Sequence, residues 1–348
     1  MREHMERAVQ IARASHPHPN PRVGAVVVDS SGRVVGEGFH QHVGGPHAEV
    51  MALDAVGELQ PGCTMYVTLE PCNHQGRTAP CTVAISDAGI SKVVIGALDP
   101  DMNVAGGGVQ ELRRRGIEVQ MSDSFPGLAD LDPGYFLHRR TGRPRFTLKS
   151  AVTLDGQVAA ADGSSKWITG EAARLDGHRL RAEADAVLAG AGTVIADDPG
   201  LDVRLEGYGG RQPRPVIIAG RRRLPADAKL FARDPLVVTT SEVDQPGELI
   251  VVDGGEDGRP DPVATARALG GRGIVDVLIE GGPGIAAAWW KAGLIDRGVW
   301  YIGARLAGGV GHNAFSGTFQ TLADARRIEI LDISKLDDDL RVEFIMED

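Results

Sequence analysis

Residues 46–53 read PHAEVMAL and residues 69–81 read LEPCNHQGRTAPC. The two stretches contain His47, Cys72 and Cys81, and one imidazole with two thiols is a donor set suited to Zn²⁺. Three protein ligands leave a fourth position for water, which is typical of a catalytic zinc site. Short β-branched runs alternate with helical stretches around both segments, so we expect a layered α/β domain that holds the metal.

Glu49 lies two residues after His47, near the start of a helix expected over Ala48–Val56. A carboxylate there can approach the metal's water without ligating the metal, and can carry a proton to a leaving amine. The order H-x-E, P-C, C is the signature of zinc-dependent nucleobase deaminases, although two residues usually separate the cysteines and here Asn73–Pro80 do. His74 in this longer loop is a candidate fourth ligand, a substrate contact or an exposed residue.

The composition limits the other classes of function. The chain has 348 residues, with 37 Lys and Arg against 47 Asp and Glu, for a formal net charge of −10. Such a chain is a poor binder of nucleic-acid backbones, because phosphate contacts need clustered Lys and Arg. No apolar stretch reaches the ~18 residues that cross a bilayer, and the charged N-terminus is unlike a signal peptide. The three cysteines all lie in the first quarter, which favours metal chemistry in a reducing cytoplasm over a disulfide framework.

The length exceeds what one hydrophobic core usually serves, so we expect two domains, residues 1–143 and 144–348, joined at the turn signal TGRP (141–144). In the first domain we predict helices at 1–14, 48–56, 82–89 and 109–116 and strands at 23–29, 33–39, 65–69, 92–95 and 117–121. In the second we predict strands at 146–152, 186–190, 215–219, 236–239, 249–252, 275–280 and 299–302, a helix at 285–292, and loops at 205–214 and 253–262.

Four segments carry a resemblance to a known family. HPNPRVGAVVV (18–28), GEGFHQHVGGPHAEVMAL (36–53), YVTLEPCNHQGRTAPC (66–81) and SAVTLDGQVA with SSKWITG (150–170) resemble the bifunctional riboflavin-biosynthesis deaminase/reductase family. The match runs in order over nearly the whole chain, and the loop of eight residues between the cysteines is typical of that family. The family's usual residue after the first cysteine is serine, whereas this chain has Asn73.

The resemblance implies a cytidine-deaminase-like three-layer α/β/α domain followed by a dihydrofolate-reductase-like α/β domain. It implies zinc-dependent deamination of 2,5-diamino-6-ribosylamino-4(3H)-pyrimidinone 5′-phosphate by the first domain. The second domain would then reduce the ribosyl group of 5-amino-6-(5-phosphoribosylamino)uracil to ribityl with NADPH. By resemblance His47, Cys72 and Cys81 hold the zinc, Glu49 shuttles the proton, and the enzyme is a cytoplasmic homo-oligomer that acts on a small pyrimidine nucleotide.

The reductase half lacks a G-x-G-x-x-G fingerprint, so nicotinamide binding must use other devices. The segment Glu280–Gly284 lies between a predicted strand and a predicted helix, where glycines let a backbone approach a pyrophosphate. A strand-to-helix turn also needs glycine for steric reasons alone. The run Arg221–Arg223 is a candidate site for the 2′-phosphate of NADPH, and a solvated charge run is the alternative.

The remaining site residues follow from the family pattern and from two local features. On the coenzyme side we expect Val152, Trp167, Thr169, Thr193, Asp197, Gly220, Gly282, Pro283 and Gly284. On the substrate side of the reductase we expect Lys149, Ser165, Arg181, Leu201, Arg204 and Glu280. Lys149 is costly in an apolar strand unless its ammonium reaches a cleft. Asn20, fixed between two prolines, presents a preorganised amide to a heterocycle edge. Either Asp197 or Glu280 is a candidate acid for opening the sugar.

Two other functions are weighed against this one. The first is a zinc deaminase of another nucleobase whose second half is not catalytic. The second is a zinc-stabilised sensor, which has no need for Glu49 beside an open zinc position. Four histidines, at positions 16, 18, 40 and 42, are expected to be loop or surface residues and not ligands.

Overall fold

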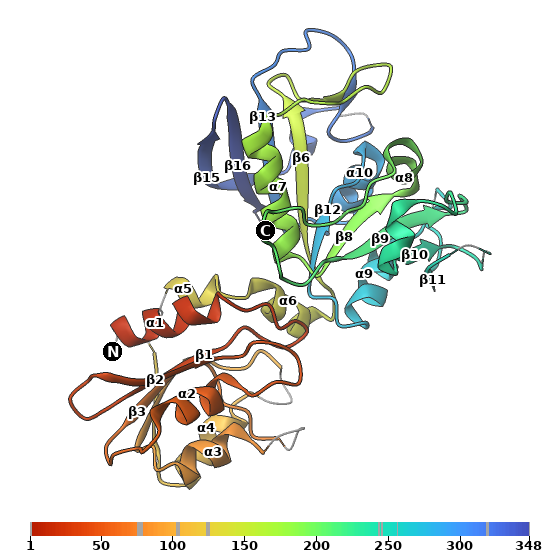
Figure 1. Ribbon diagram of the computed structural model, residues 1–348. Coiled ribbons are helices and arrows are strands. Elements are labelled where there is room, and N and C mark those ends of the chain that lie inside the picture. The colour runs from red at the N-terminus through yellow and green to blue at the C-terminus, as the bar shows by residue number, and fades with distance from the viewer. Residues whose placement is uncertain are drawn as a thin grey trace. The chain divides into compact units, whose positions relative to one another are not determined.

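The computed structural model describes residues 2–74, 79–101, 105–122, 126–242, 244, 246–255, 257–317 and 320–347. The chain divides into two compact units, Met1–Gly142 and Arg143–Asp348, each with its own sheet (Figure 1). Both units combine helices with a sheet that contains parallel strands, so the predicted α/β class is confirmed.

The first unit has a mixed sheet in the order β2-β1-β3-β4-β5. Strand β1 pairs antiparallel with β2 and β3, whereas β3, β4 and β5 run parallel. The strands are β1 (Gly24–Val28), β2 (Val34–Phe39), β3 (Thr64–Leu69), β4 (Lys92–Ala97) and β5 (Glu118–Met121). The helices are α1 (Arg2–Ala12), α2 (Ala48–Val56), α3 (Cys81–Asp87), α4 (Gly107–Arg114), α5 (Pro126–Ala129) and α6 (Pro133–Thr141).

Helices cover both faces of this sheet (Figure 1). On one face α1 packs Met5, Ala8 and Ala12 against buried side chains of β1, β3 and β4. On the other, α2 lies close against β2, where a Cβ on Gly38 would stand 2.4 Å from the Ala52 nitrogen. Glycine at position 38 therefore lets α2 approach the sheet, and with it the residues at the start of α2.

The second unit has a longer sheet in the order β11-β10-β9-β8-β12-β6-β13-β16-β15. In this order, each strand from β11 through to β13 runs parallel to its neighbour. Strand β16 pairs antiparallel with both β13 and β15. Its first strands are β6 (Arg145–Thr153), β8 (Ala186–Gly190), β9 (Arg214–Gly220), β10 (Leu236–Thr239) and β11 (Glu248–Val251). The others are β12 (Asp276–Ile279), β13 (Arg297–Gly303), β15 (Ile328–Leu336) and β16 (Asp339–Met346); β7 (Gln157–Ala159) pairs apart with β14 (His312–Asn313).

Two hydrophobic clusters fill the space between this sheet and its helices. Helices α9 (Pro262–Gly270) and α10 (Pro283–Lys291) bury Leu269 and Trp289 against one face. Helices α7 (Glu171–Glu183) and α8 (Ala191–Asp197) bury Leu180 and Val194 against the other. Short 3-10 turns at Lys229–Arg233 and Leu322–Asp324 complete the unit.

Each predicted strand and helix is present, with its ends within about two residues of the expected positions. The sequence did not predict helices α5 to α9, the short strands β7 and β14, or the C-terminal hairpin of β15 and β16. Strand β15 shows why, because its apolar side chains are largely exposed and alternate with charged ones on a sheet edge. Such a strand lacks the buried β-branched run by which the inner strands were recognised.

Candidate functional site

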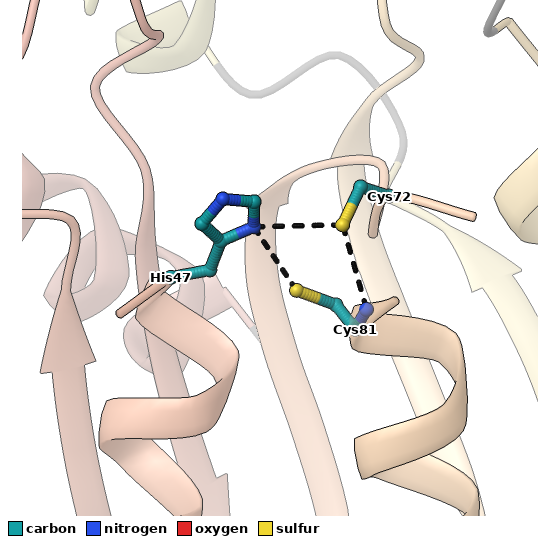
Figure 2. Close-up of side chains that lie close together, drawn as sticks. All are labelled: His47, Cys72 and Cys81. Atoms are coloured by element: carbon teal, nitrogen blue, oxygen red, sulfur yellow. Dashed lines mark hydrogen bonds between the residues drawn. The ribbon is translucent and has the colours of Figure 1, made fainter. Parts of the chain in front are cut away.

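Three side chains from separate elements meet in the first unit (Figure 2). His47 immediately precedes α2, Cys72 follows β3, and Cys81 is the first residue of α3. His47 Nδ1 lies 3.2 Å from Cys81 Sγ and 3.5 Å from Cys72 Sγ, and the three possible ligand atoms lie within 4.8 Å of one another. One nitrogen and two sulfurs in this arrangement fit a Zn²⁺ ion.

Hydrogen bonding has opposite effects on the two sulfurs: the Cys72 hydrogen bond and burial raise the pKa of the Cys81 thiol, whereas the pKa of the Cys72 thiol is lowered. The Cys81 thiol and then the His47 ring hydrogen-bond to Cys72 Sγ and lower the pKa of the Cys72 thiol, against the effect of burial. The Cys81 backbone N–H also donates to Cys72 Sγ, at 3.4 Å. The site therefore prepares at least one of its sulfurs for a metal before any metal binds.

Glu49 lies in the first turn of α2, with only 3% of its surface exposed. Burial raises the pKa of its carboxyl to about 7, and the neighbouring Cys72 sulfur adds to the effect. The carboxyl lines the same cavity as His47 and Cys72 of the cluster. Glu49 is thus placed beside the cluster without being part of it.

The cavity over the cluster has a volume of about 410 Å³. Asn20 lines it, and Asn20 Nδ2 lies 3.0 Å from His40 Nε2. The other nitrogen of His40, Nδ1, lies 2.9 Å from the carbonyl oxygen of Pro46, which can only accept. Burial lowers the pKa of His40, so the ring is neutral, Nδ1 donates to Pro46, and Nε2 accepts from Asn20.

His40 is therefore a buried residue of the loop after β2 that orients the Asn20 amide; it lies in a loop, as one of the two expected settings, but not on the surface. His42, two residues later, is exposed as expected. Nothing local in the sequence separates the two histidines, because the contact of His40 with Pro46 depends on how the intervening loop folds back.

The loop between the two cysteines is described only at its ends, and residues 75–78 lie outside the described residues. His74 lines the cavity, but among the described residues no fourth side chain joins the cluster of His47, Cys72 and Cys81. Asn73, which stands where the family usually has serine, accepts a hydrogen bond of 2.9 Å from Thr82 Oγ1. The substitution thus keeps a polar tie between the loop and α3.

In the second unit, glycines line the space between α8 and α10. A Cβ on Gly281 would stand 2.6 Å from Ile285 Cβ, so this position needs glycine for packing. A Cβ on Gly282 would instead point toward Thr193 Oγ1, 4.0 Å away. Pro283 and Gly284 then begin α10. An open backbone beside a helix start fits the pyrophosphate of a dinucleotide coenzyme.

Arg181 and Glu280 form a nearly buried pair behind these glycines. Arg181 Nε and Nη2 donate to the two carboxylate oxygens of Glu280 at 2.7 and 2.8 Å, and Nη1 donates to the Asp202 carbonyl at 2.8 Å. Burial alone would raise the pKa of Glu280, but the Arg181 charge outweighs it and lowers the pKa to about 2. Glu280 is therefore an anion near neutral pH, which disfavours it as the acid that opens the sugar.

The segment SSKWITG borders a second cavity, of about 430 Å³, which Ser165 and Trp167 line. Trp167 is 61% exposed, so it is not a core aromatic residue. The Arg174 guanidinium lies 4.6 Å from the centre of its ring and donates to the carbonyl of the buried Thr169 at 2.8 Å. Arg174 therefore holds this segment in place from α7.

The other expected residues occupy varied settings. Val152 and Leu201 are buried, and Gly220 closes β9. Lys149 Nζ lies 5.9 Å from the centre of the Tyr301 ring. Asp197 pairs with Lys166 at 3.0 Å, and the exposed Arg204 lies 3.8 Å from Asp202.

Two family models match the chain. The cytidine and deoxycytidylate deaminase zinc-binding region matches residues 1–97, and the RibD C-terminal domain matches residues 144–342. The riboflavin biosynthesis protein RibD of Bacillus amyloliquefaciens is 37% identical over 99% of this chain and 96% of its own length. The chain belongs to the RibD family. The members of this family are bifunctional deaminases and reductases of riboflavin biosynthesis, so the predicted family and enzyme classes are confirmed.

Solved structures of RibD proteins agree over the whole length. Acinetobacter baumannii RibD superposes with a TM-score of 0.92 at 38% identity, covering 100% of this chain and 99% of that one. A deaminase/reductase from Thermotoga maritima superposes with a TM-score of 0.90 at 35% identity, covering 99% and 98%. The predicted order of a cytidine-deaminase-like domain and a RibD reductase domain is confirmed. In the described part of the chain no helix is long and apolar enough to cross a membrane.

The zinc cluster yields a first prediction. Replacing Cys81 by serine removes one of the two sulfurs, so the purified Cys81→Ser variant should retain less than about a tenth of the wild-type zinc under mild chelation. Cys63→Ser is the matched control, because Cys63 is a buried cysteine of the same unit outside the cluster. Metal analysis of both variants measures the difference, and equal zinc in the two would contradict the assignment.

The Arg181–Glu280 pair yields a second prediction. Glu280→Gln leaves the Arg181 charge buried without its partner and should lower the free energy of unfolding by about 3–5 kcal/mol at pH 7. Because the pKa of Glu280 is lowered from 4.5 to about 2 in the folded protein, its contribution is full above pH 4.5. This stabilising contribution is lost as the pH falls toward 2. The difference in free energy of unfolding between wild type and variant should therefore shrink over that pH range. Urea unfolding across the pH series measures it, with the exposed Glu242→Gln as control.

Proposed function

We propose that residues 1–143 deaminate 2,5-diamino-6-ribosylamino-4(3H)-pyrimidinone 5′-phosphate, and that residues 144–348 then reduce the ribosyl group of the product to ribityl with NADPH. The observation that carries the proposal is a cavity lined by Glu49 and by His47 and Cys72 of the cluster, in a chain that also has a RibD C-terminal domain. The printed name of the Thermotoga relative, a diaminohydroxyphosphoribosylaminopyrimidine deaminase and 5-amino-6-(5-phosphoribosylamino)uracil reductase, supports both steps.

In the deaminase step, His47, Cys72 and Cys81 hold zinc, which when bound activates water as a nucleophile at neutral pH. Glu49 takes a proton from the attacking water and delivers it to the departing amine, which leaves as ammonia. Asn20, held by its hydrogen bond to His40, pairs with an edge of the pyrimidine and orients it. The cavity that Glu49 shares with His47 and Cys72 supports the assignment, because proton transfer needs the donor and the acceptor within hydrogen-bond reach.

In the reductase step, NADPH supplies a hydride when it is bound. Thr193, Gly220, Gly282, Pro283 and Gly284 hold its phosphates, because their backbone is open at the carboxyl edge of the sheet. The coenzyme is flanked further by Val152, Trp167, Thr169 and Asp197.

The substrate contacts Lys149, Ser165, Arg181, Leu201, Arg204 and Glu280. Of the two arginines, Arg204 is better placed for the substrate phosphate. The Arg181 guanidinium already donates hydrogen bonds to the Glu280 carboxylate and the Asp202 carbonyl, whereas Arg204 is exposed and lies 3.8 Å from Asp202. Glu280 carries no proton near neutral pH and Asp197 pairs with Lys166 at 3.0 Å, so neither carboxylate is favoured as the acid that opens the sugar.

Replacing Glu49 by glutamine separates the two steps. Glu49→Gln should keep its zinc but lose ammonia release by about 10²–10⁴-fold, because the amide cannot carry the proton. The same variant should still reduce the deaminated pyrimidine with NADPH at the wild-type rate. Mass analysis with and without NADPH measures both steps. Normal deamination would contradict the role of Glu49, and no coenzyme-dependent gain of two hydrogens in the wild type would contradict the reductase assignment.

We also propose that the enzyme is a cytoplasmic homo-oligomer, in which β15 pairs with β15 of a second copy. Strand β15 lies at the edge of the sheet and exposes Ile328, Ile330, Leu331 and Ile333. A long edge strand with exposed apolar side chains is prone to pair with another chain. When the same strand of two copies pairs about a two-fold axis, the result is a closed dimer. The three unpaired cysteines support a reducing compartment.

Charged substitutions in β15 test the proposed interface. Ile330→Lys with Ile333→Lys should convert the oligomer to a smaller species in sedimentation velocity, because like charges would face each other across the two-fold axis. Val310→Lys, which changes another exposed apolar residue outside β15, is the control. A monomeric wild type, or an unchanged oligomer in the double variant, would contradict the proposed contact.

A further inference from the structure

The segment Gly200–Arg204 belongs to no helix or strand of the second unit, yet it carries two of the expected substrate contacts, Leu201 and Arg204. Leu201 and Val203 are buried, so the polar groups of the backbone around them need partners within the protein. The backbone of Leu201 has a φ of +51°, a left-handed conformation that a leucine keeps only where its surroundings hold it. The form of this segment therefore depends on side chains that reach it from elsewhere in the unit.

Gln212 and Arg181 supply such contacts. Gln212 bonds to both backbone groups of Val203: its Oε1 accepts from the N–H at 2.7 Å, and its Nε2 donates to the carbonyl at 3.1 Å. In a sheet, a neighbouring strand would form this pair of bonds, and here one amide side chain forms them. Arg181 Nη1 donates to the Asp202 carbonyl at 2.8 Å, so two successive residues of the segment are fixed.

His178, on α7, fixes the next residue. The Arg204 N–H donates to His178 Nδ1 at 3.2 Å. A backbone N–H can only donate, so Nδ1 carries no proton and the ring is neutral, with its proton on Nε2. Burial, and then the positive charges of Arg181 and Arg204, lower the pKa of His178, while the negative charge of Glu280 acts in the opposite direction. His178 is therefore neutral near pH 7 and can accept this bond.

The Arg204 side chain is held far less than its backbone. The side chain is 65% exposed, and among the described residues its guanidinium has one ion pair, at 3.8 Å from Asp202 Oδ1. An exposed pair at that distance contributes little and yields to a stronger anion. A guanidinium that is available, on a backbone that is fixed, is suited to bind a phosphate with little loss of conformational entropy.

We propose that His178 and Gln212 are positioning residues of the reductase, which hold the backbone of Val203 and Arg204 so that the Arg204 guanidinium meets the 5′-phosphate of the uracil substrate. The proposal rests on the proposed reductase function and on Arg204 as the phosphate ligand. Both residues act through Arg204, and neither belongs to a motif that the sequence singled out.

His178 also makes this arrangement sensitive to pH. Protonation places a hydrogen on Nδ1, where it faces the Arg204 N–H, and two donors cannot bond to each other. Because its pKa is lowered, His178 gains this proton only below the ordinary histidine value of 6.5. Binding of the substrate phosphate therefore weakens as the pH falls through that range.

Steady-state reduction by the full chain, with NADPH and the phosphorylated uracil substrate, tests the assignment. His178→Leu should raise the KM for this substrate by about tenfold and change kcat by less than about threefold, because the lost interaction is a binding contact remote from the hydride. The same variant should reduce the substrate that lacks the 5′-phosphate with kcat/KM within about threefold of wild type. Gln212→Leu should give the same pattern.

Two further variants complete the design. His178→Gln keeps an oxygen that accepts the Arg204 N–H and should restore most of the wild-type KM, whereas His312→Leu changes an exposed histidine of the same unit and should have no effect. Between about pH 5 and pH 8, the KM of the wild type should rise at low pH more than that of His178→Gln. The substrate phosphate itself titrates near pH 6 in both cases, so the difference between the two enzymes reports on His178.

The outcomes separate the inference from the function on which it rests. A wild-type KM in His178→Leu or in Gln212→Leu would overturn the role of that residue. An equal loss with and without the 5′-phosphate would mean that the residue only stabilises the fold, and would also overturn its role. Tighter binding at low pH that is absent from His178→Gln would make His178 a direct phosphate ligand, against the proposal. A wild type that does not reduce the substrate with NADPH would instead contradict the reductase function itself.

Discussion

The meeting of the His47 imidazole with the sulfurs of Cys72 and Cys81 is the interaction around which the first unit is organised. Each ligand stands where an element begins or ends: His47 just before α2, Cys72 just after β3, and Cys81 at the start of α3. The cluster therefore needs α2 and α3 on the same face of the sheet, which Gly38 makes possible by admitting α2 close to β2. The cavity beside the cluster follows from the same packing.

Glu49 and Glu280 show how similar burial gives carboxylates opposite properties. Burial, and then the neighbouring Cys72 sulfur, raise the pKa of Glu49 to about 7, and no Lys or Arg of the described residues bonds to it. Arg181 donates bidentate hydrogen bonds to the Glu280 carboxylate. The Arg181 charge outweighs burial and lowers the pKa of Glu280 to about 2. These environments support the proposal that Glu49 transfers a proton and that Glu280 holds Arg181.

Much of the fold and the zinc cluster could be predicted because their signals are local. Buried β-branched runs mark the inner strands, and soft ligands in a specific string mark the metal site. The rest depends on contacts between distant segments. His40 is buried in a place that its own neighbours in the sequence do not reveal, because its contact with the Pro46 carbonyl depends on the fold of the intervening loop. Strand β15 was not predicted from the sequence, because its apolar side chains face outward at the sheet edge and do not form a buried run.

The central claim is that the zinc has two sulfurs, one imidazole and one position open to solvent, and X-ray absorption at the zinc edge tests it most directly. We expect two sulfur scatterers at about 2.3 Å and two light scatterers at about 2.0 Å, with the multiple-scattering signal of a single imidazole. A third sulfur, or the signal of a second imidazole from His74, would mean that protein fills the fourth position. Either result would contradict a catalytic zinc at this site.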